Sequence, residues 1–241
     1  MTSHPMDWNE VARSYSTVEN TRKPNVFPFL REQLERSKPG RLLDFGCGSG
    51  VFALMCRDLA GAIFNYDISA EMRSLASEAA SGIANISVLS TLDELQPESI
   101  DVITMNAVWM CLPSATACAD ALRSMNRLLR TGGQLFASFT HPCFRDRKFS
   151  AYETNFDQRK YLVNATSFRV RVFDRKKSVE LIDTHWNFSA VTEQLVNGGF
   201  LIKRIHELPD IPGEAGETLG SPWVVLEAVK TVRASDDTQK F

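Results

Sequence analysis

A glycine-rich segment at residues 42–50 constrains the fold more than any other part of this sequence. It reads Leu-Leu-Asp-Phe-Gly-Cys-Gly-Ser-Gly, with its glycines at Gly46, Gly48 and Gly50. The apolar residues and Asp44 predict the end of a buried strand, and the apolar run after Gly50 predicts the start of a helix. Glycine permits positive φ and lets a ligand approach the backbone closely. Parallel α/β sheets bind nucleotide-like ligands at such turns, so the segment predicts a ligand site.

The spacing of the glycines narrows the choice of ligand. A dinucleotide-binding turn would place its third glycine at position 51, where the β-branched Val51 stands. Asp-x-Gly-x-Gly-x-Gly after an apolar strand instead resembles the first motif of class I S-adenosylmethionine-dependent methyltransferases. About twenty residues later, a second apolar strand at Ala62–Tyr66 ends at Asp67, and an acid there accepts hydrogen bonds from ribose hydroxyls. Asp67 suits NAD as well as S-adenosylmethionine, so it indicates a nucleoside ligand without choosing between them.

Short apolar runs alternate with helical segments over the next hundred residues, which is typical of a parallel sheet with crossover helices. The predicted strands are Arg41–Phe45, Ala62–Tyr66, Ile86–Leu89, Asp101–Asn106, Gln134–Phe139, Phe200–Glu207 and Trp223–Lys230. The predicted helices are Val51–Leu59, Ser69–Ala80, Ser114–Leu129 and Phe188–Val196, preceded by two helices within residues 7–38. We expect Thr131-Gly132-Gly133 to stop the third of these helices. Over residues 40–140 and 187–230 this order resembles the class I methyltransferase fold.

The resemblance implies an α/β fold with a Rossmann-like, seven-stranded, mostly parallel sheet and helices on both faces. The sequence pattern changes at His141, where an irregular stretch rich in aromatic residues begins. A predicted hairpin follows it: Phe168, Val170 and Val172 alternate with arginines, and Val179 begins the partner strand. We therefore expect one domain over residues 1–241. Residues 1–40 would form a helical cap, and residues 141–187 would form a β-hairpin lid inserted after the fifth strand.

Composition excludes several classes of protein. The formal net charge of -2 shows no overall basic character, so we expect no nucleic-acid partner. No apolar run approaches ~20 residues and no secretory signal is evident, so we expect no membrane partner. The five cysteines are odd in number and none has CxxC spacing, which predicts reduced thiols and a cytoplasmic location. His141 and Cys143 alone are weak evidence for a metal, so we expect none.

The resemblance also implies S-adenosyl-L-methionine as the cofactor, held where these motifs meet. Asp44 and the glycines would lie beside its methionine part, and Asp67 would bind its ribose. Ile68 and Met72 would pack near the adenine, although Met72 also suits the core. Family members often carry an acid at the end of strand three, where this chain has Thr91 and Leu92. The expected donor-binding residues are Asp44, Gly46, Cys47, Gly48, Gly50, Asp67, Ile68, Met72, Thr91, Leu92 and Asn106.

Fewer signals concern the acceptor. Residues 106–110 lack the Asn-Pro-Pro-Tyr sequence of nucleic-acid amino methyltransferases. Trp109 could stack on an aromatic acceptor or pack under the next helix. Tyr15 resembles a residue of the N-terminal helix that closes over the donor, with a hydroxyl that could reach donor or acceptor. His141 and His185 could take a proton from the nucleophile, or be structural. We therefore expect catalytic roles for Tyr15, His141 and His185 and substrate contacts from these three and Trp109.

These observations predict methyl transfer to a small-molecule acceptor, an aromatic or heterocyclic metabolite, by in-line displacement. Positioning supplies most of the catalysis in such a reaction, so no triad or metal is needed. Three alternatives stay open: an NAD-dependent oxidoreductase, a methyltransferase-fold binding protein without transfer activity, and a protein methyltransferase. The sequence leaves the attacking atom open among O, N, S and C.

Overall fold

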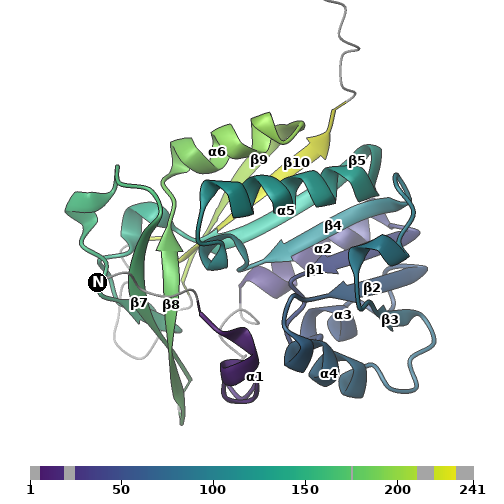
Figure 1. Cartoon of the computed structure of the whole chain (residues 1–241), viewed down its shortest axis with the longest axis horizontal. Helices are drawn as coiled ribbons and strands as arrows, with labels where there is room; N and C mark the ends of the chain where they lie inside the picture. The colour runs from purple at the N-terminus through teal and green to yellow at the C-terminus, as the bar shows by residue number, and fades with distance from the viewer. Residues whose placement is uncertain (1–5, 19–24, 175, 211–219, 232–241) are drawn as a thin grey trace, which may run out of the picture.

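Seven strands form the main sheet of the computed structural model, which describes residues 6–18, 25–174, 176–210 and 220–231 (Figure 1). They are β1 (Arg41–Phe45), β2 (Ala62–Tyr66), β3 (Ile86–Val88), β4 (Ile100–Asn106), β5 (Leu129–Thr140), β9 (Phe200–Leu208) and β10 (Trp223–Lys230). Their order in the sheet is β3-β2-β1-β4-β5-β10-β9. The first five pair in parallel, and β10 is antiparallel to both its neighbours. The predicted Rossmann-like fold class is confirmed.

Helices cover both faces of this sheet. They are α1 (Trp8–Ser16), α2 (Val26–Ser37), α3 (Val51–Met55), α4 (Ala70–Ala79), α5 (Ala115–Leu128) and α6 (Phe188–Asn197). In the view of Figure 1, α5 and α6 lie in front of the sheet and α2 lies behind it. Short 3-10 turns follow several strands: η2 (Leu92–Glu94), η3 (Trp109–Cys111), η4 (Pro142–Phe144) and η5 (Gln158–Lys160).

Side-chain caps fix where the main helices begin. Ser69, Ser114 and Asn187 accept hydrogen bonds from the backbone N–H of Met72, Ala117 and Ala190, at 3.1, 3.1 and 2.8 Å. Such caps satisfy N–H groups that have no partner within the helix, and each contributes about 1 kcal/mol.

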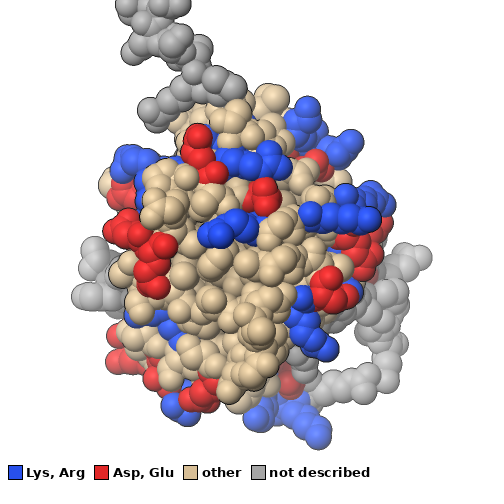
Figure 2. Space-filling view, turned by 90° about the vertical axis from the view of Figure 1, so that its right-hand side faces the viewer, with Lys and Arg blue, Asp and Glu red and all other residues tan. Residues whose placement is uncertain are grey.

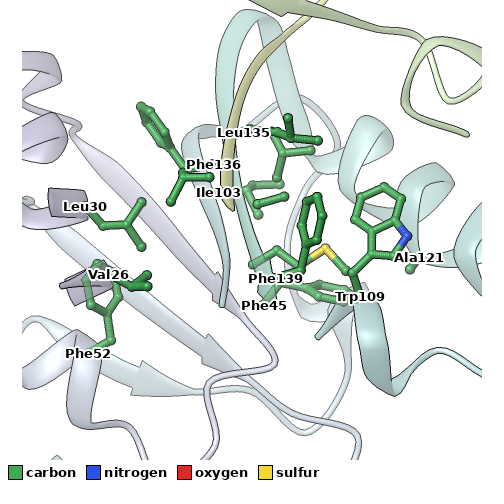
Figure 3. Close-up of a cluster of buried hydrophobic side chains, with 14 of the residues drawn as sticks. Val26, Leu30, Phe45, Phe52, Ile103, Trp109, Ala121, Leu135, Phe136 and Phe139 are labelled. Atoms are coloured by element: carbon green, nitrogen blue, oxygen red, sulfur yellow. The ribbon is translucent and has the colours of Figure 1, made fainter. Parts of the chain in front are cut away.

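The core lies between the sheet and its helices (Figure 3). On one side Phe27 of α2 packs against Phe52 of α3, with ring centroids 5.1 Å apart. On the other side Trp109 lies beside Phe139 and Ala121. Burying each large apolar side chain contributes about 1.5–3 kcal/mol, so these contacts fix the helices on the sheet.

A second, antiparallel sheet consists of β6 (Tyr152–Thr154), β7 (Thr166–Phe173) and β8 (Ser178–His185). The predicted alternation holds, because Phe168, Val170 and Val172 are buried whereas Arg169 and Arg171 are exposed. The expected hairpin is therefore present. Strand β6 was expected to be irregular; its pairing with β7 depends on a partner about 16 residues away, which local sequence does not reveal.

Two expected boundaries were wrong. Helix α3 ends at Met55 rather than Leu59, and the chain continues as turns. Thr131-Gly132-Gly133 does not end α5, because β5 begins directly after that helix and contains both glycines. The pairing of β4 with β5 shifts register here, and Gly132 has a φ of 73°. A β-bulge of this kind often requires a glycine with positive φ. This explains why Gly132-Gly133 resembled the glycine signal that ends a helix.

The parallel strands point their carboxyl ends toward α1 and the antiparallel sheet (Figure 1). The chain order reverses between β1 and β4, and ligands bind α/β sheets at such a switch point. Among the described residues, no helix combines the length and apolar character that crossing a bilayer requires.

Candidate active site

A cavity of about 570 Å³ lies at the carboxyl ends of β1, β2 and β4, where the glycine-rich turn was expected to bind its ligand. This volume falls within the range of about 300–1,000 Å³ that small-molecule sites occupy. Residues from these strands, α1 and α5 line it. They are Met6, Trp8, Tyr15, Phe27, Asp44, Phe45, Gly46, Cys47, Gly48, Phe52, Tyr66, Asp67, Ile68, Met72, Leu92, Asn106, Ala107, Val108, Cys111, Leu112, Pro113, Ala117, Asp120, Ala121 and Ser124.

The glycine turn has the backbone conformation that only glycine adopts readily. Gly46, Gly48 and Gly50 have φ angles of 75°, 55° and 80°. A Cβ at Gly46 would lie 2.2 Å from Val108 Cγ2, whereas a Cβ at Gly48 would meet nothing within 4 Å. Gly46 therefore allows the turn to pack against the β4 loop, and Gly48 leaves its backbone open to a ligand.

Asp67 fixes two backbone segments around the cavity. Its Oδ2 accepts from the Gly48 N–H and its Oδ1 from the Ser69 N–H, both at 2.9 Å. Burial raises the pKa of Asp67, and these two hydrogen bonds oppose that rise. An ionised carboxylate offers about four acceptor positions, so it keeps acceptor capacity for a ribose hydroxyl. The geometry fits the expected ribose contact.

Asp44 forms the centre of a buried polar network beneath the cavity. Its Oδ1 accepts from Thr104 Oγ1 at 2.8 Å and from Asn106 Nδ2 at 3.3 Å. Asn106 Oδ1 in turn accepts from Ser138 Oγ at 3.3 Å. The network links the ends of β1, β4 and β5, so it holds the carboxylate and the Asn106 backbone in fixed positions at the cavity wall.

The residues expected near adenine divide into two groups. Ile68, Met72 and Leu92 line the cavity, although Met72 is also 2% exposed and part of the core. Thr91 is exposed and does not line it; its N–H donates to Glu94 Oε1 at 2.8 Å. Gly50 is also outside the lining, because it begins α3 against Asn65 and Ala76.

Helix α1 places two aromatic residues over the cavity. Trp8 and Tyr15 both line it, and their rings meet edge to face with centroids 5.4 Å apart. Tyr15 was among the expected site residues. Trp8 was missed, although it shares the apolar face of the same predicted helix.

Three of the expected acceptor residues lie away from the cavity. Trp109 is 1% exposed and packs on Phe139, which is the structural alternative weighed for it. His141 donates from Nε2 to Glu207 Oε1 at 2.6 Å and accepts the Cys143 N–H at Nδ1. With both nitrogens engaged and no contact with the cavity, it has no route to a substrate proton there.

His185 is likewise buried away from the cavity. It stacks on Phe156, and its Nε2 contacts the Tyr161 carbonyl oxygen at 2.8 Å, which only accepts, so Nε2 carries the hydrogen. Burial lowers its pKa to about 4. Trp109, His141 and His185 therefore do not line the cavity. Among the described residues, no three His, Cys, Asp or Glu side chains group together as metal ligands.

The largest group of missed residues lies on α5. Ala117, Asp120, Ala121 and Ser124 line the cavity from one face of this helix. Their i, i+3, i+4, i+7 spacing of small and short polar residues was visible in the sequence. It gave no functional signal, because nothing local shows that α5 faces the carboxyl end of β4.

Comparison with known proteins agrees with this geometry. Residues 43–137 match a family model described as a methyltransferase domain. A search of curated proteins found no match. Several solved structures are similar in fold, among them two S-adenosylmethionine-dependent methyltransferases. That from Mesorhizobium loti is 19% identical, with 88% of this chain and 100% of that chain covered and a TM-score of 0.62. That from Clostridium acetobutylicum is 13% identical, with 93% and 99% covered and a TM-score of 0.64.

A third similar structure is the N-methyltransferase NodS from Bradyrhizobium japonicum in complex with S-adenosyl-L-homocysteine. It is 14% identical, with 90% of this chain and 98% of that chain covered and a TM-score of 0.55. The family match covers the glycine turn, Asp67 and the end of β4, which all contribute residues to the cavity wall. Residues 43–137 are therefore similar to a methyltransferase domain, and the chain shares the fold of solved S-adenosylmethionine-dependent methyltransferases.

Proposed function

We propose that this protein is an S-adenosylmethionine-dependent methyltransferase that methylates a small-molecule acceptor with an apolar, aromatic or heterocyclic body. One observation carries the proposal: the cavity that holds the expected donor-binding residues is also lined by Trp8 and Tyr15 of α1. A concave cavity with apolar and aromatic walls suits a small acceptor better than a protein segment or a duplex.

Bound S-adenosylmethionine supplies a methyl group activated by its positive sulfur. A lone pair of the acceptor forms the new bond to the methyl carbon while the carbon–sulfur bond breaks, and that bond's electron pair stays on sulfur. The protein's part is positioning, which contributes about 7–11 kcal/mol in well-oriented reactions. Asp67 would orient the ribose, the Gly46–Gly48 backbone would approach the amino-acid part, and Trp8 and Tyr15 would exclude water.

Charge and cysteine chemistry support the rest of the proposal. On the face shown in Figure 2, described Lys and Arg side chains are interspersed with Asp and Glu rather than forming a continuous basic surface. This arrangement argues against a nucleic-acid acceptor.

All five cysteines are free thiols, which fits a reducing, cytoplasmic compartment. We also propose a single domain, with residues 1–40 as its cap and 141–187 as its lid.

Calorimetric titration tests the donor site and the enzyme class together. We expect S-adenosylmethionine and S-adenosylhomocysteine to bind at one site each per chain, and NAD and NADH not to bind. Nicotinamide binding in place of either nucleoside would favour the oxidoreductase. Donor binding without methylation of any compound in a fractionated metabolite extract would favour a binding protein, and methylation confined to its protein fraction would favour a protein methyltransferase.

A further inference from the structure

A second, smaller chamber adjoins the donor cavity under the antiparallel sheet. Its volume is about 30 Å³, enough for one small polar group, since a water needs about 10–15 Å³ on this measure. It shares Trp8, Tyr15, Ala107 and Cys111 with the donor cavity, so the two adjoin beneath α1. Its remaining walls come from η3, β5, the three strands β6–β8 and β10.

Most of the chamber wall is apolar, and its polar groups are few. Tyr152 reaches it, but the Tyr152 hydroxyl already donates to the Pro222 carbonyl oxygen at 2.7 Å. Thr140, at the end of β5, is 3% exposed, and its Oγ1 has no hydrogen-bond partner among the described residues. A buried hydroxyl without a hydrogen-bond partner is unfavourable, so it indicates a ligand group that pairs with it.

Asp183 of β8 supplies the other polar wall. It is 3% exposed and lines the chamber. Arg145 lies close enough for the Asp183 charge to act on it, is itself 1% exposed, and compensates the buried carboxylate. Arg145 does not line the chamber, whereas Asp183 does. A group entering the chamber therefore meets a carboxylate and a hydroxyl rather than a cation.

We propose that Thr140 and Asp183 bind the reacting group of the acceptor and select a hydroxyl. A hydroxyl both donates and accepts: its O–H donates to the Asp183 carboxylate, one oxygen lone pair accepts from the Thr140 hydroxyl, and the second lone pair remains for the methyl carbon. An ether lacks the donor, and a carboxylate is repelled by Asp183. The apolar body would extend past Trp8 and Tyr15 into the larger cavity. This inference deepens the proposed function and rests on it.

Three ring compounds of similar shape test the selection on protein saturated with S-adenosylhomocysteine. Phenol donates and accepts, anisole only accepts, and benzoate is an anion. Ligand-observed NMR titration should show phenol binding at least about tenfold tighter than anisole or benzoate, since a hydrogen bond to a charged group contributes about 1.5–3 kcal/mol. The measurement needs no turnover.

Three variants assign the preference to this chamber. Thr140→Val keeps the side-chain shape and removes the hydroxyl; Asp183→Asn removes the charge. Each should reduce the preference for phenol to about threefold or less while leaving S-adenosylhomocysteine affinity unchanged. Glu180→Gln removes a charge from an exposed position on the same strand and should change neither quantity. If Asp183→Asn fails to fold because Arg145 loses its counter-charge, Thr140→Val decides alone.

The outcomes separate this inference from the proposed function. Failure of the protein to bind S-adenosylhomocysteine contradicts the donor site. If S-adenosylhomocysteine binds, three results overturn the inference alone: no binding of phenol, anisole or benzoate binding as tightly as phenol, or a phenol preference that Thr140→Val leaves intact.

Discussion

Asp67 illustrates how much one side chain determines at the scale of the residue. Its two oxygens hold the N–H groups of Gly48 and Ser69, so the carboxylate shapes the turn before any ligand contacts it. The position of an acid at the tip of β2 was evident from the sequence. Its second task, fixing the glycine turn, follows only from the proximity of two segments about 20 residues apart.

We expect Asp67→Ala to weaken S-adenosylhomocysteine binding at least about tenfold, because hydrogen bonds to a charged acceptor contribute about 1.5–3 kcal/mol. Calorimetry measures the change. Asp93→Ala provides the control: this acid is also near Leu92 but is 90% exposed and pairs with Arg127 at the surface. Equal affinities for Asp67→Ala and the unaltered protein would remove Asp67 from the donor site.

Gly46 and Gly48 should respond differently to alanine, although both have positive φ. In Gly46→Ala the new Cβ meets Val108 at 2.2 Å, so we expect a loss of unfolding free energy beyond the ~1–2 kcal/mol of the backbone conformation. Gly48→Ala should lose only the unfolding free energy that the strained backbone conformation costs. Its methyl group faces the cavity, however, and should weaken donor binding. Urea unfolding and S-adenosylhomocysteine titration separate the two effects. Equal stability losses would contradict the packing role of Gly46.

At the scale of the element, α1 carries the two aromatic residues that line the cavity, and polar groups connect it to α4. Asn9 Oδ1 accepts from Ser69 Oγ at 2.9 Å and from the Glu71 N–H at 3.3 Å. Arg13 pairs with Glu71 at 2.7 Å, with its side chain 74% exposed. These polar contacts help to hold α1, and with it Trp8 and Tyr15, at the cavity.

We expect Asn9→Ala to weaken S-adenosylhomocysteine binding about fivefold, because losing about 1 kcal/mol of hydrogen bonding lowers the population of covered cavity. Arg13→Ala should change affinity less than about twofold, since an exposed ion pair contributes about 0–1 kcal/mol. Stopped-flow dissociation should show the Asn9→Ala effect in the off-rate. An effect of Arg13→Ala as large as that of Asn9→Ala would contradict this view of α1.

At the scale of the whole molecule, two buried histidines couple stability to pH. Burial lowers the pKa of His185 from 6.5 to about 4 and lowers that of His141. Between the unfolded and the native pKa of each histidine, the histidine is protonated in the unfolded chain but not in the native protein. The free energy of unfolding therefore falls as pH falls through this range. For His185 the loss amounts to about 3 kcal/mol between pH 6.5 and pH 4, at about 1.4 kcal/mol for each pKa unit, and it ends below pH 4.

We expect His185→Phe to flatten this dependence. Urea unfolding across pH 4 to 6.5 should show a smaller loss of stability in the variant than in the unaltered protein, while the His141 contribution remains in both. Phenylalanine keeps an aromatic ring against Phe156. Parallel stability curves for the two proteins would show that His185 is not kept neutral by burial.

The sequence by itself determined the sheet and the glycine turn, and it favoured S-adenosylmethionine as the donor. Those features depend on local signals, since strand periodicity, glycine spacing and an acid at the end of a strand are each evident within a few residues of the chain. Tertiary structure decided which of the aromatic and titratable residues face the ligand. Trp109, His141 and His185 point into packed regions, whereas Trp8 and the small residues of α5 line the cavity. The direction in which a side chain points depends on how distant elements pack against one another. The spacing of residues within one helix or strand does not predict that packing.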